Sequence, residues 1–431
     1  MKDSKKAIWS WACYDWANSA FATTVMAGFF PVFFKAYWST GTTVQQSTFY
    51  LGLANSIASI FVAALAPILG AIADRGSMKK KFLIFFAYLG CIMTGGLWFV
   101  QTGLWPMAIL FYITATIGFS GANIFYDSLL PSVASAKKID YASSLGFGLG
   151  YIGGGLLFLI NVAMYLKPEL FGIADSTLAI RISFLTVAIW WALFSIPIML
   201  FVKEPKNYEK VSTRQAVKEG FQQLGHTFKE IRHLKVVGIF LIAYWLYIDG
   251  VDTIVRMAVD YGTSIGFPAD SLIIALLLVQ FVAFPATLLY NIFGQKIGIK
   301  KALLIAIVAY SFIAIFGYFM VETWHFYALA VAIGLFQGGI QALSRSYYTR
   351  LIPEQQAAEF FGFFNLLGKF AAVIGPVLMG GVTILTGSNR LGMLSIVVLF
   401  IAGGVMLLKV DEDEGKKNLE AYLETGKQQI I

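Results

Sequence analysis

The sequence predicts an all-α integral membrane protein with twelve transmembrane helices, arranged as two six-helix pseudo-repeats. Composition, the length of the apolar stretches and internal repetition all support this prediction. Hydrophobic residues make up 58% of the 431 residues and charged residues only 13%, whereas a soluble domain is about one quarter charged. The composition therefore indicates a membrane protein and disfavours a soluble enzyme.

The apolar stretches are long enough to cross a bilayer as helices. A hydrocarbon core about 30 Å thick needs roughly 20 apolar residues per helix. Many of the stretches are apolar on all sides, which is typical of helices surrounded by lipid and by one another. The short alternating segments of a β-barrel are not seen in the sequence. The predicted helices cover residues 8–36, 49–73, 82–101, 105–128, 142–165, 180–202, 236–257, 269–293, 302–321, 325–349, 358–386 and 391–409.

Lysine and arginine are unevenly distributed between the two sides of these helices. When the N-terminus is placed in the cytoplasm, 25 of the 32 basic residues fall on the cytoplasmic side, 4 on the opposite side and 3 within helices. This distribution follows the positive-inside rule. We therefore expect a multi-pass protein of the cell membrane with both termini in the cytoplasm. The net charge of +8 then faces lipid headgroups, and we expect no nucleic-acid partner.

A polar segment divides the chain into two halves. We expect an N-terminal bundle at 1–202, a linker at 203–235, a C-terminal bundle at 236–409 and a cytoplasmic tail at 410–431. Apolar residues in the linker recur at spacings of three and four, which predicts a helix lying on the cytoplasmic membrane surface. A soluble connector helix packed on the protein fits the same pattern. The apolar residues are Val217, Phe221, Leu224, Phe228 and Ile231.

The two halves repeat each other in sequence. The stretch 70–80 aligns without gaps with 291–301, at an offset of 221 residues. The segment FYDSLLP, which begins at Phe125, aligns with YYTRLIP, which begins at Tyr347, at an offset of 222. Such a constant offset indicates two parallel six-helix bundles related by an axis along the membrane normal.

The loop GAIADRGSMKKK resembles the signature loop between helices 2 and 3 of the major facilitator superfamily. Ser77 replaces the second glycine of the signature. The resemblance implies that Asp74 pairs across the bundle interface with cationic and helix-end groups. Gln295 takes the place of Asp74 in the second repeat, so we expect that contact to be weaker. A plain positively charged cytoplasmic loop is the alternative. The residues that match the signature are Gly70, Asp74, Arg75, Lys79 and Lys80.

Three longer segments resemble one particular family, that of the fungal vacuolar effluxers and their bacterial relatives. They begin at Trp11 (WACYDWANSAFATTVMAGFFPVFF), Gln341 (QALSRSYYTRLIP) and Phe360 (FFGFFNLLGKFAAVIGP). The similarity covers nearly the whole chain. It implies the major facilitator fold and, through the bacterial members, a place in the bacterial inner membrane. The fungal members export amino acids from the vacuole, but the resemblance says little about cargo.

Charged residues inside the predicted helices are candidates for function. Each costs at least about 2.5–3.5 kcal/mol at the centre of a membrane helix, so such residues normally face a partner or a water-filled cavity. In the fold that the chain resembles, helices 1, 4, 7 and 10 line the cavity, and here each of them carries a charge. These charges are Asp15, Asp127, Asp249, Asp252, Arg256 and Arg345, and Lys369 lies on helix 11.

The charges on the seventh helix are regularly spaced. Asp249, Asp252 and Arg256 are three and four residues apart and are expected to share one face. Asp252 and Arg256 can pair locally. Asp249 then remains for a proton, for a substrate ammonium group or for Lys369.

We divide the candidate residues into two groups by expected role. For every charge, a structural or gating ion pair is the alternative to direct contact with substrate. The candidates for binding substrate or protons are Asp15, Asn18, Asp249, Asp252, Asn365 and Lys369. The candidates for gating are Gly70, Asp74, Arg75, Lys79, Lys80, Asp127, Arg256 and Arg345.

These patterns favour a secondary transporter of a small polar solute, an amino acid or related zwitterion, that works by alternating access. Coupling to protons is an open option. The same fold with a sugar, a drug or an organic anion as cargo is the first alternative. A receptor or a membrane enzyme is disfavoured, because no catalytic cluster is found and the longest polar stretch has 33 residues. We expect a monomer without cofactor or metal, in contact with solute and lipid bilayer.

Overall fold

The computed structural model describes residues 2–42, 44–204 and 235–428, and these residues form helices and no strands. Ten helical segments within them are long and apolar enough to cross a membrane. Two shorter apolar segments, Leu53–Val62 and Ile374–Thr386, lie inside two further long helices. Together they correspond to the twelve predicted helices, and the predicted all-helical fold is confirmed.

The N-terminal half begins with a long helix formed by α1 (Lys5–Ala20) and its continuation to Trp38. This continuation is π-helical at Phe21–Phe29 and Phe34–Trp38, on either side of a short turn that contains Pro31. Proline removes a backbone donor and disturbs the regular ladder. This irregularity was not predicted from the sequence. The other helices are α3 (Val44–Gly76), α4 (Lys79–Gly96), α5 (Trp105–Val133), α6 (Ile139–Leu166), α7 (Ser176–Phe194) and α8 (Ile196–Phe201).

The C-terminal half has the same order of long helices, followed by one additional helix. It comprises α10 (Lys235–Ser264), α11 (Ala269–Ile297), α12 (Ile299–Phe319), α13 (Thr323–Leu351), α14 (Ala357–Thr386), α15 (Asn389–Ser395) and α16 (Val397–Leu408). The additional helix, α17 (Glu412–Gln428), lies in the predicted tail. The helix predicted in the linker, with Val217 to Ile231, falls outside the described residues and stays a prediction.

Each half has its own apolar core. Trp38 and Trp191 are fully buried in the N-terminal cluster, and Tyr310 and Phe400 in the C-terminal cluster. Large apolar side chains also cover the outside of the bundle, for example Phe312, which is 66% exposed. In water such a surface would be costly, but in a bilayer it meets lipid chains of the same polarity.

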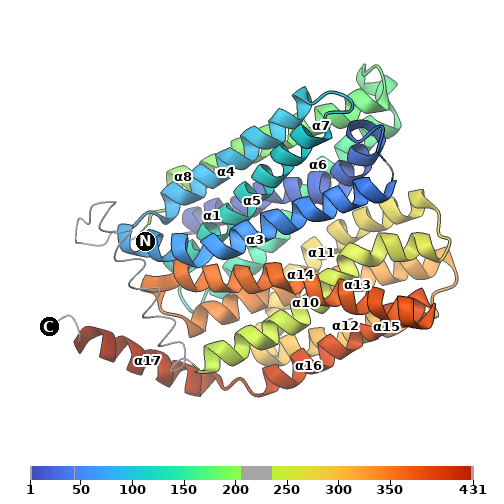
Figure 1. Cartoon of the computed structure of the whole chain (residues 1–431). Coiled ribbons are helices and arrows are strands. Elements are labelled where there is room, and N and C mark those ends of the chain that lie inside the picture. Colours follow the sequence, from blue (N-terminus) through green and yellow to red (C-terminus); the bar gives the residue numbers. More distant parts are fainter. Residues whose placement is uncertain (1, 43, 205–234, 429–431) are drawn as a thin grey trace.

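The two halves lie side by side and meet chiefly through two pairs of long helices. α3 packs against α14 and α6 packs against α11 (Figure 1). The first contact is very close, because a Cβ atom on Gly70 would lie 2.3 Å from the carbonyl oxygen of Ala358. Only a glycine allows this separation of the two backbones.

Both chain ends lie at the same end of the bundle, called here the terminus-bearing end (Figure 1). The N-terminal segment is fixed there, since Asp3 Oδ1 accepts a hydrogen bond of 2.9 Å from the backbone N–H of Ser135. This contact lowers the pKa of Asp3. At the other terminus, α17 approaches Val236 and Leu351 at Gly415. An even number of crossings is required to bring both termini to one side.

The two signature loops show the predicted repeat in three dimensions. Ser77, between α3 and α4, has φ +49°, and Gly298, at the equivalent place between α11 and α12, has φ +96°. Lys80 Nζ donates to the carbonyl of Val202 at the end of the sixth membrane helix. Lys300 Nζ donates to that of Val410, after the twelfth. Cations are favourable at helix C-termini. In each half, a lysine that follows the signature loop therefore stabilises the end of the last membrane helix.

Candidate transport site

A polar cavity of about 200 Å³ lies between the two halves. It is bordered by side chains from α1, α5 and α6 of the N-terminal half and from α10, α13 and α14 of the C-terminal half. Its charged residues, among the described side chains, are Asp15, Asp127, Asp252, Arg256 and Arg345. All five were candidates from the sequence, and the fold brings them together from four helices.

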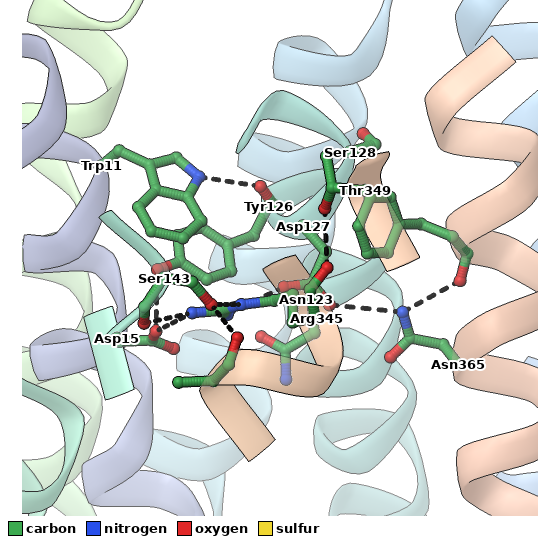
Figure 2. A network of polar contacts seen from close by, with 12 residues as sticks. Trp11, Asp15, Asn123, Tyr126, Asp127, Ser128, Ser143, Arg345, Thr349 and Asn365 are labelled. Atoms are coloured by element: carbon green, nitrogen blue, oxygen red, sulfur yellow. Dashed lines mark hydrogen bonds and ion pairs between the residues drawn. The ribbon is translucent and has the colours of Figure 1, made fainter. Parts of the chain in front are cut away.

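Arg345 on α13 is the centre of the network at this cavity (Figure 2). Its Nη1 lies 3.0 Å from Asp127 Oδ1 and its Nη2 lies 3.5 Å from Asp15 Oδ2. Nε and Nη2 also donate to the hydroxyl and the backbone carbonyl of Ser143, both at 2.9 Å. The side chain is only 4% exposed. One cation of the C-terminal half therefore joins two carboxylates and a helix of the N-terminal half.

Aromatic side chains enclose this cation. The guanidinium carbon of Arg345 lies 4.1 Å from the ring centre of Phe147 and 4.9 Å from that of Trp11. Trp11 stacks on Tyr126 with ring centres 4.3 Å apart, and the Tyr126 hydroxyl donates to Asp15 Oδ2 at 2.7 Å (Figure 2). Cation–π contacts stabilise a guanidinium that has lost most of its water.

Amide side chains extend the network toward α14 and α1. Asn365 Nδ2 lies 3.4 Å from Asp127 Oδ2 and also donates to the carbonyl of Phe361 (Figure 2). Asn18, one turn after Asp15, donates to Asn123 Oδ1 at 2.6 Å. Both predicted amides therefore lie within the polar network, although Asn18 itself does not border the cavity among the described residues.

The acidic residues of α10 separate in the structure. Asp252 and Arg256 border the cavity and approach each other to 3.8 Å, as the sequence suggested. Asp249 instead turns into the C-terminal half, where Oδ1 accepts from the backbone N–H of Gly375 at 3.0 Å. The expectation of one shared face was too simple. Asp249 and Asp252 are three residues apart, a rotation of about 300° around the helix, so their side chains point in directions about 60° apart.

Two predicted residues lie on helices whose course is described while their side chains are not. These are Arg75 near the end of α3 and Lys369 in the middle of α14. The expected pairing of Lys369 with Asp249 stays a prediction. The cation found beside Asp15 is Arg345, one of the gating candidates from the sequence.

A second polar cluster joins the halves at the terminus-bearing end. Asp74 accepts hydrogen bonds from the backbone N–H groups of Ala358 at 3.2 Å and Glu359 at 2.8 Å, and its carboxylate lies 2.7 Å from Lys79 Nζ. The first N–H groups of a helix have no partner within the helix and favour negative charge. Asp74 thus caps α14 from the opposite half, the geometry that the loop resemblance implied.

Two further ion pairs close the same end. Arg350 on α13 pairs with Asp140 on α6, and Lys2 pairs with Glu354 before α14. Each pair connects one half with the other. The halves are therefore held together between the cavity and the terminus-bearing end.

Several residues of the network were missed in the sequence. Tyr126 precedes Asp127 in the repeated FYDSLLP segment, and that position was a usable signal. Ser143, Phe147 and Trp11 carry no comparable signal, because a single hydroxyl or aromatic residue in an apolar helix is most often a packing residue.

Solved structures identify the fold. The chain superposes on the proton:xylose symporter XylE with a TM-score of 0.70 and 16% identity, over 97% of each chain. It matches the human organic anion transporter MFSD10 with a TM-score of 0.68 and 14% identity, over 94% of this chain and all of the other. The fold and the inter-bundle cavity define a transporter of the major facilitator type, with no substrate specified.

Sequence relatives identify the family. A family model described as "Vacuole effluxer Atg22 like" matches residues 35–420. An uncharacterised MFS-type transporter of Bacillus subtilis, YxiO, is 41% identical over 96% of both chains. Autophagy-related protein 22 of Yarrowia lipolytica is 26% identical over 82% of this chain and 74% of its own. The chain belongs to the Atg22-like family, which confirms the resemblance seen in the sequence.

Proposed function

We propose that this transporter moves a small zwitterion, most simply an amino acid, across the cell membrane by alternating access. The observation that carries the proposal is the mixed charge of the cavity, where three carboxylates and two guanidinium groups among the described side chains surround about 200 Å³. A zwitterion needs a cation for its carboxylate and an anion for its ammonium group. Pockets for drug-sized ligands usually measure about 300–1,000 Å³, so the volume favours a compact solute.

The residues of the cavity differ in how free they are to bind cargo. Arg345 is enclosed by Asp15, Asp127 and three aromatic rings. Arg256 has a side chain that is 53% exposed, and its contact with Asp252 is long. We assign the solute carboxylate to Arg256 and the ammonium group to the carboxylates opposite, while Arg345 holds those carboxylates in place.

The alternating movement follows from the contacts between the halves. The uneven distribution of basic residues supports a cytoplasmic position for the terminus-bearing end. This conformation, held closed there by Asp74 and by the Arg350–Asp140 pair, is then the outward-facing one. Opening to the cytoplasm requires these contacts to break while the halves rock about the cavity.

A second candidate cargo is a sugar or another ring-shaped solute. Phe147, Tyr244 and Phe364 border the cavity and offer faces on which a ring can stack. The five charges argue against a neutral solute, because such a solute would leave them without compensation. Among the described side chains the carboxylates outnumber the guanidinium groups, which argues against an organic anion.

Counterflow in proteoliposomes tests the proposal. The purified protein is reconstituted with an excess of unlabelled amino acids inside, and entry of a radiolabelled amino-acid mixture is followed. We expect entry above that of protein-free liposomes, with competition by amino acids and none by xylose or succinate. Entry equal to that of empty liposomes, or competition by sugars or dicarboxylates alone, would contradict the zwitterion proposal.

A further inference from the structure

Asp249 is a buried acid that belongs neither to the cavity nor to the contacts between the halves. Its side chain is fully buried within the C-terminal half. Oδ1 accepts from the Gly375 backbone N–H at 3.0 Å and from the Thr253 hydroxyl at 3.3 Å. Among the residues that the structure describes, Oδ2 is buried without a hydrogen-bond partner. Half of the carboxylate is therefore satisfied and half is not.

No cation pairs with Asp249 among the described side chains. α16, which packs closely on α10, has no charged residue. Asp252, three residues further along α10, faces the cavity. Arg345 on α13 is paired with Asp127 and Asp15, and Tyr247 is paired with Ser344. The remaining titratable or charged residues on α10 and on the helices packed against it are Lys235, Tyr244, Arg256, Asp260, Tyr261, Asp270, Tyr290, Lys296, Lys300, Lys301, Tyr310, Tyr318, His325, Tyr327, Tyr347, Tyr348, Arg350, Glu359, Lys369, Arg390, Glu412, Asp413, Glu414, Lys416, Lys417, Glu420, Tyr422, Glu424 and Lys427. The side chains of Asp260, Asp270, Lys369, Tyr422, Glu424 and Lys427 are not described.

An ionised carboxylate in this position carries a large desolvation cost, and no cation among the described side chains offsets it. Binding of one proton removes the charge and converts Oδ2 into a donor. Acidic residues inside membrane helices mark proton pathways for this reason. The reaction is a simple protonation equilibrium of the carboxylate and needs no other reactant.

Gly375, the backbone partner of Asp249, lies on α14, and this helix also contributes to the cavity and to the closed end. A Cβ atom on Gly375 would lie 1.9 Å from Thr253 Oγ1 and 2.8 Å from Asp249 Oδ1, so the glycine permits the approach. The next residue, Pro376, lies inside α14 and removes one hydrogen bond of that helix. The same helix begins at the groups capped by Asp74 and carries Asn365 at the cavity.

We propose that Asp249 binds the proton that couples transport to a proton gradient, at a site separate from the cargo cavity. This inference rests on the proposed function. A charge change at Asp249 alters its bond to Gly375, and α14 transmits that change to the cavity and to the closed end. The proton site then lies within the C-terminal half and the cargo cavity lies between the halves, and α14 contributes to both.

Two assays on the same proteoliposomes separate the proton site from the cargo site. Exchange at equal pH needs only the cargo site, whereas accumulation driven by an imposed pH gradient also needs the proton site. For Asp249→Asn we expect exchange of the radiolabelled amino-acid mixture within about twofold of wild type and loss of gradient-driven accumulation. Asp175→Asn, at the exposed start of α7, is the matched control and should leave both unchanged.

The outcomes distinguish the two proposals. If wild type exchanges amino acids but ignores the pH gradient, or if Asp249→Asn accumulates them as wild type does, the proton site is wrong and the transport function stands. If wild type does not exchange them, both proposals fail. Thr253→Val provides a second variant that keeps the acid. It should move the pH profile of accumulation without changing exchange, and an unmoved profile would contradict the assignment.

Discussion

At the scale of single residues, the cavity depends most on Arg345. A guanidinium group has several donors in a fixed plane, and here they reach Asp127, Asp15 and Ser143 at once. Removing one partner of a buried ion pair typically costs about 3–5 kcal/mol, because the other charge is left unpaired. The ammonium group of a lysine keeps the charge but lacks the planar, forked arrangement of donors of a guanidinium group.

Arg345→Lys should therefore lower the rate of amino-acid counterflow at least tenfold while the protein still folds. The rate is measured in proteoliposomes, and folding is checked by size-exclusion chromatography and thermal unfolding. Arg390→Lys is the matched control, because Arg390 donates to the carbonyl of Tyr318, away from the cavity. Equal rates for the two variants would show that the fork of Arg345 is not needed.

Ser77 gives a second prediction at this scale. It adopts φ +49°, a left-handed conformation that costs a residue with a side chain roughly 1–2 kcal/mol. Glycine avoids this cost but loses more entropy on folding, by roughly 0.5–1 kcal/mol. Ser77→Gly should therefore raise the unfolding temperature slightly, by about 1–2 °C.

The equivalent residue of the second repeat supplies the matched comparison for Ser77. Gly298 has φ +96°, so Gly298→Ala should lower the unfolding temperature of the purified protein. A decrease for Ser77→Gly, or no change for Gly298→Ala, would contradict the assignment of strain to these loops.

At the scale of elements, the approach of α3 to α14 decides whether the terminus-bearing end can close. Gly70→Ala places a Cβ atom 2.3 Å from a backbone oxygen, which cannot move as a side chain can. We expect the variant to favour conformations that are open at this end. Spin labels at Lys81→Cys and Lys301→Cys, both exposed, should then show longer distances in a protein without Cys13 and Cys91.

A glycine with free space around it is the control for this substitution. A Cβ atom on Gly238 in α10 would meet no atom within 4 Å, so Gly238→Ala should leave the distances unchanged. If Gly70→Ala also leaves them unchanged, the close contact of α3 with α14 does not govern closure.

The helices also show which features of the fold could be predicted from the sequence. Apolar length predicted all twelve membrane helices, and charge inside them predicted the charged residues described at the cavity. The predicted helix at 105–128 ends too early, because α5 continues as a buried helix to Val133. Hydropathy detects the part of a helix that faces lipid and is insensitive to its extension within the protein.

Partnerships between helices could not be predicted in the same way. Arg345 meets Ser143 and Asp127, which are 202 and 218 residues away along the chain. Spacing within one helix fixes which side chains are neighbours, but the rotation of each helix depends on packing against all the others. Within α10, the offset of about 60° between Asp249 and Asp252 is enough to place one in the C-terminal half and the other at the cavity.

At the scale of the whole molecule, the two repeats explain why one chain can alternate between two conformations. Each half has its own apolar core, so each can move as a unit. The contacts between them at the closed end include the Asp74 cap and the Arg350–Asp140 pair, and one copy of the signature loop has Asp74 while the other has Gln295. The polar contacts can exchange for water when the halves separate.

Access to the cavity from the two membrane faces tests the central claim most directly. Gly368 borders the cavity, and a Cβ atom there would make only an ordinary contact of 3.7 Å with Tyr244. The Gly368→Cys variant is prepared in a protein without the native cysteines. It is treated with a membrane-impermeant thiol reagent in right-side-out and in inside-out vesicles. Ala306→Cys, at a buried position, is the control that should not be labelled. We predict labelling from the outer face, slowed by saturating amino acids, and labelling from the cytoplasmic face in the Gly70→Ala background. A cysteine that stays unreactive from both faces would contradict an alternating-access cavity at this place.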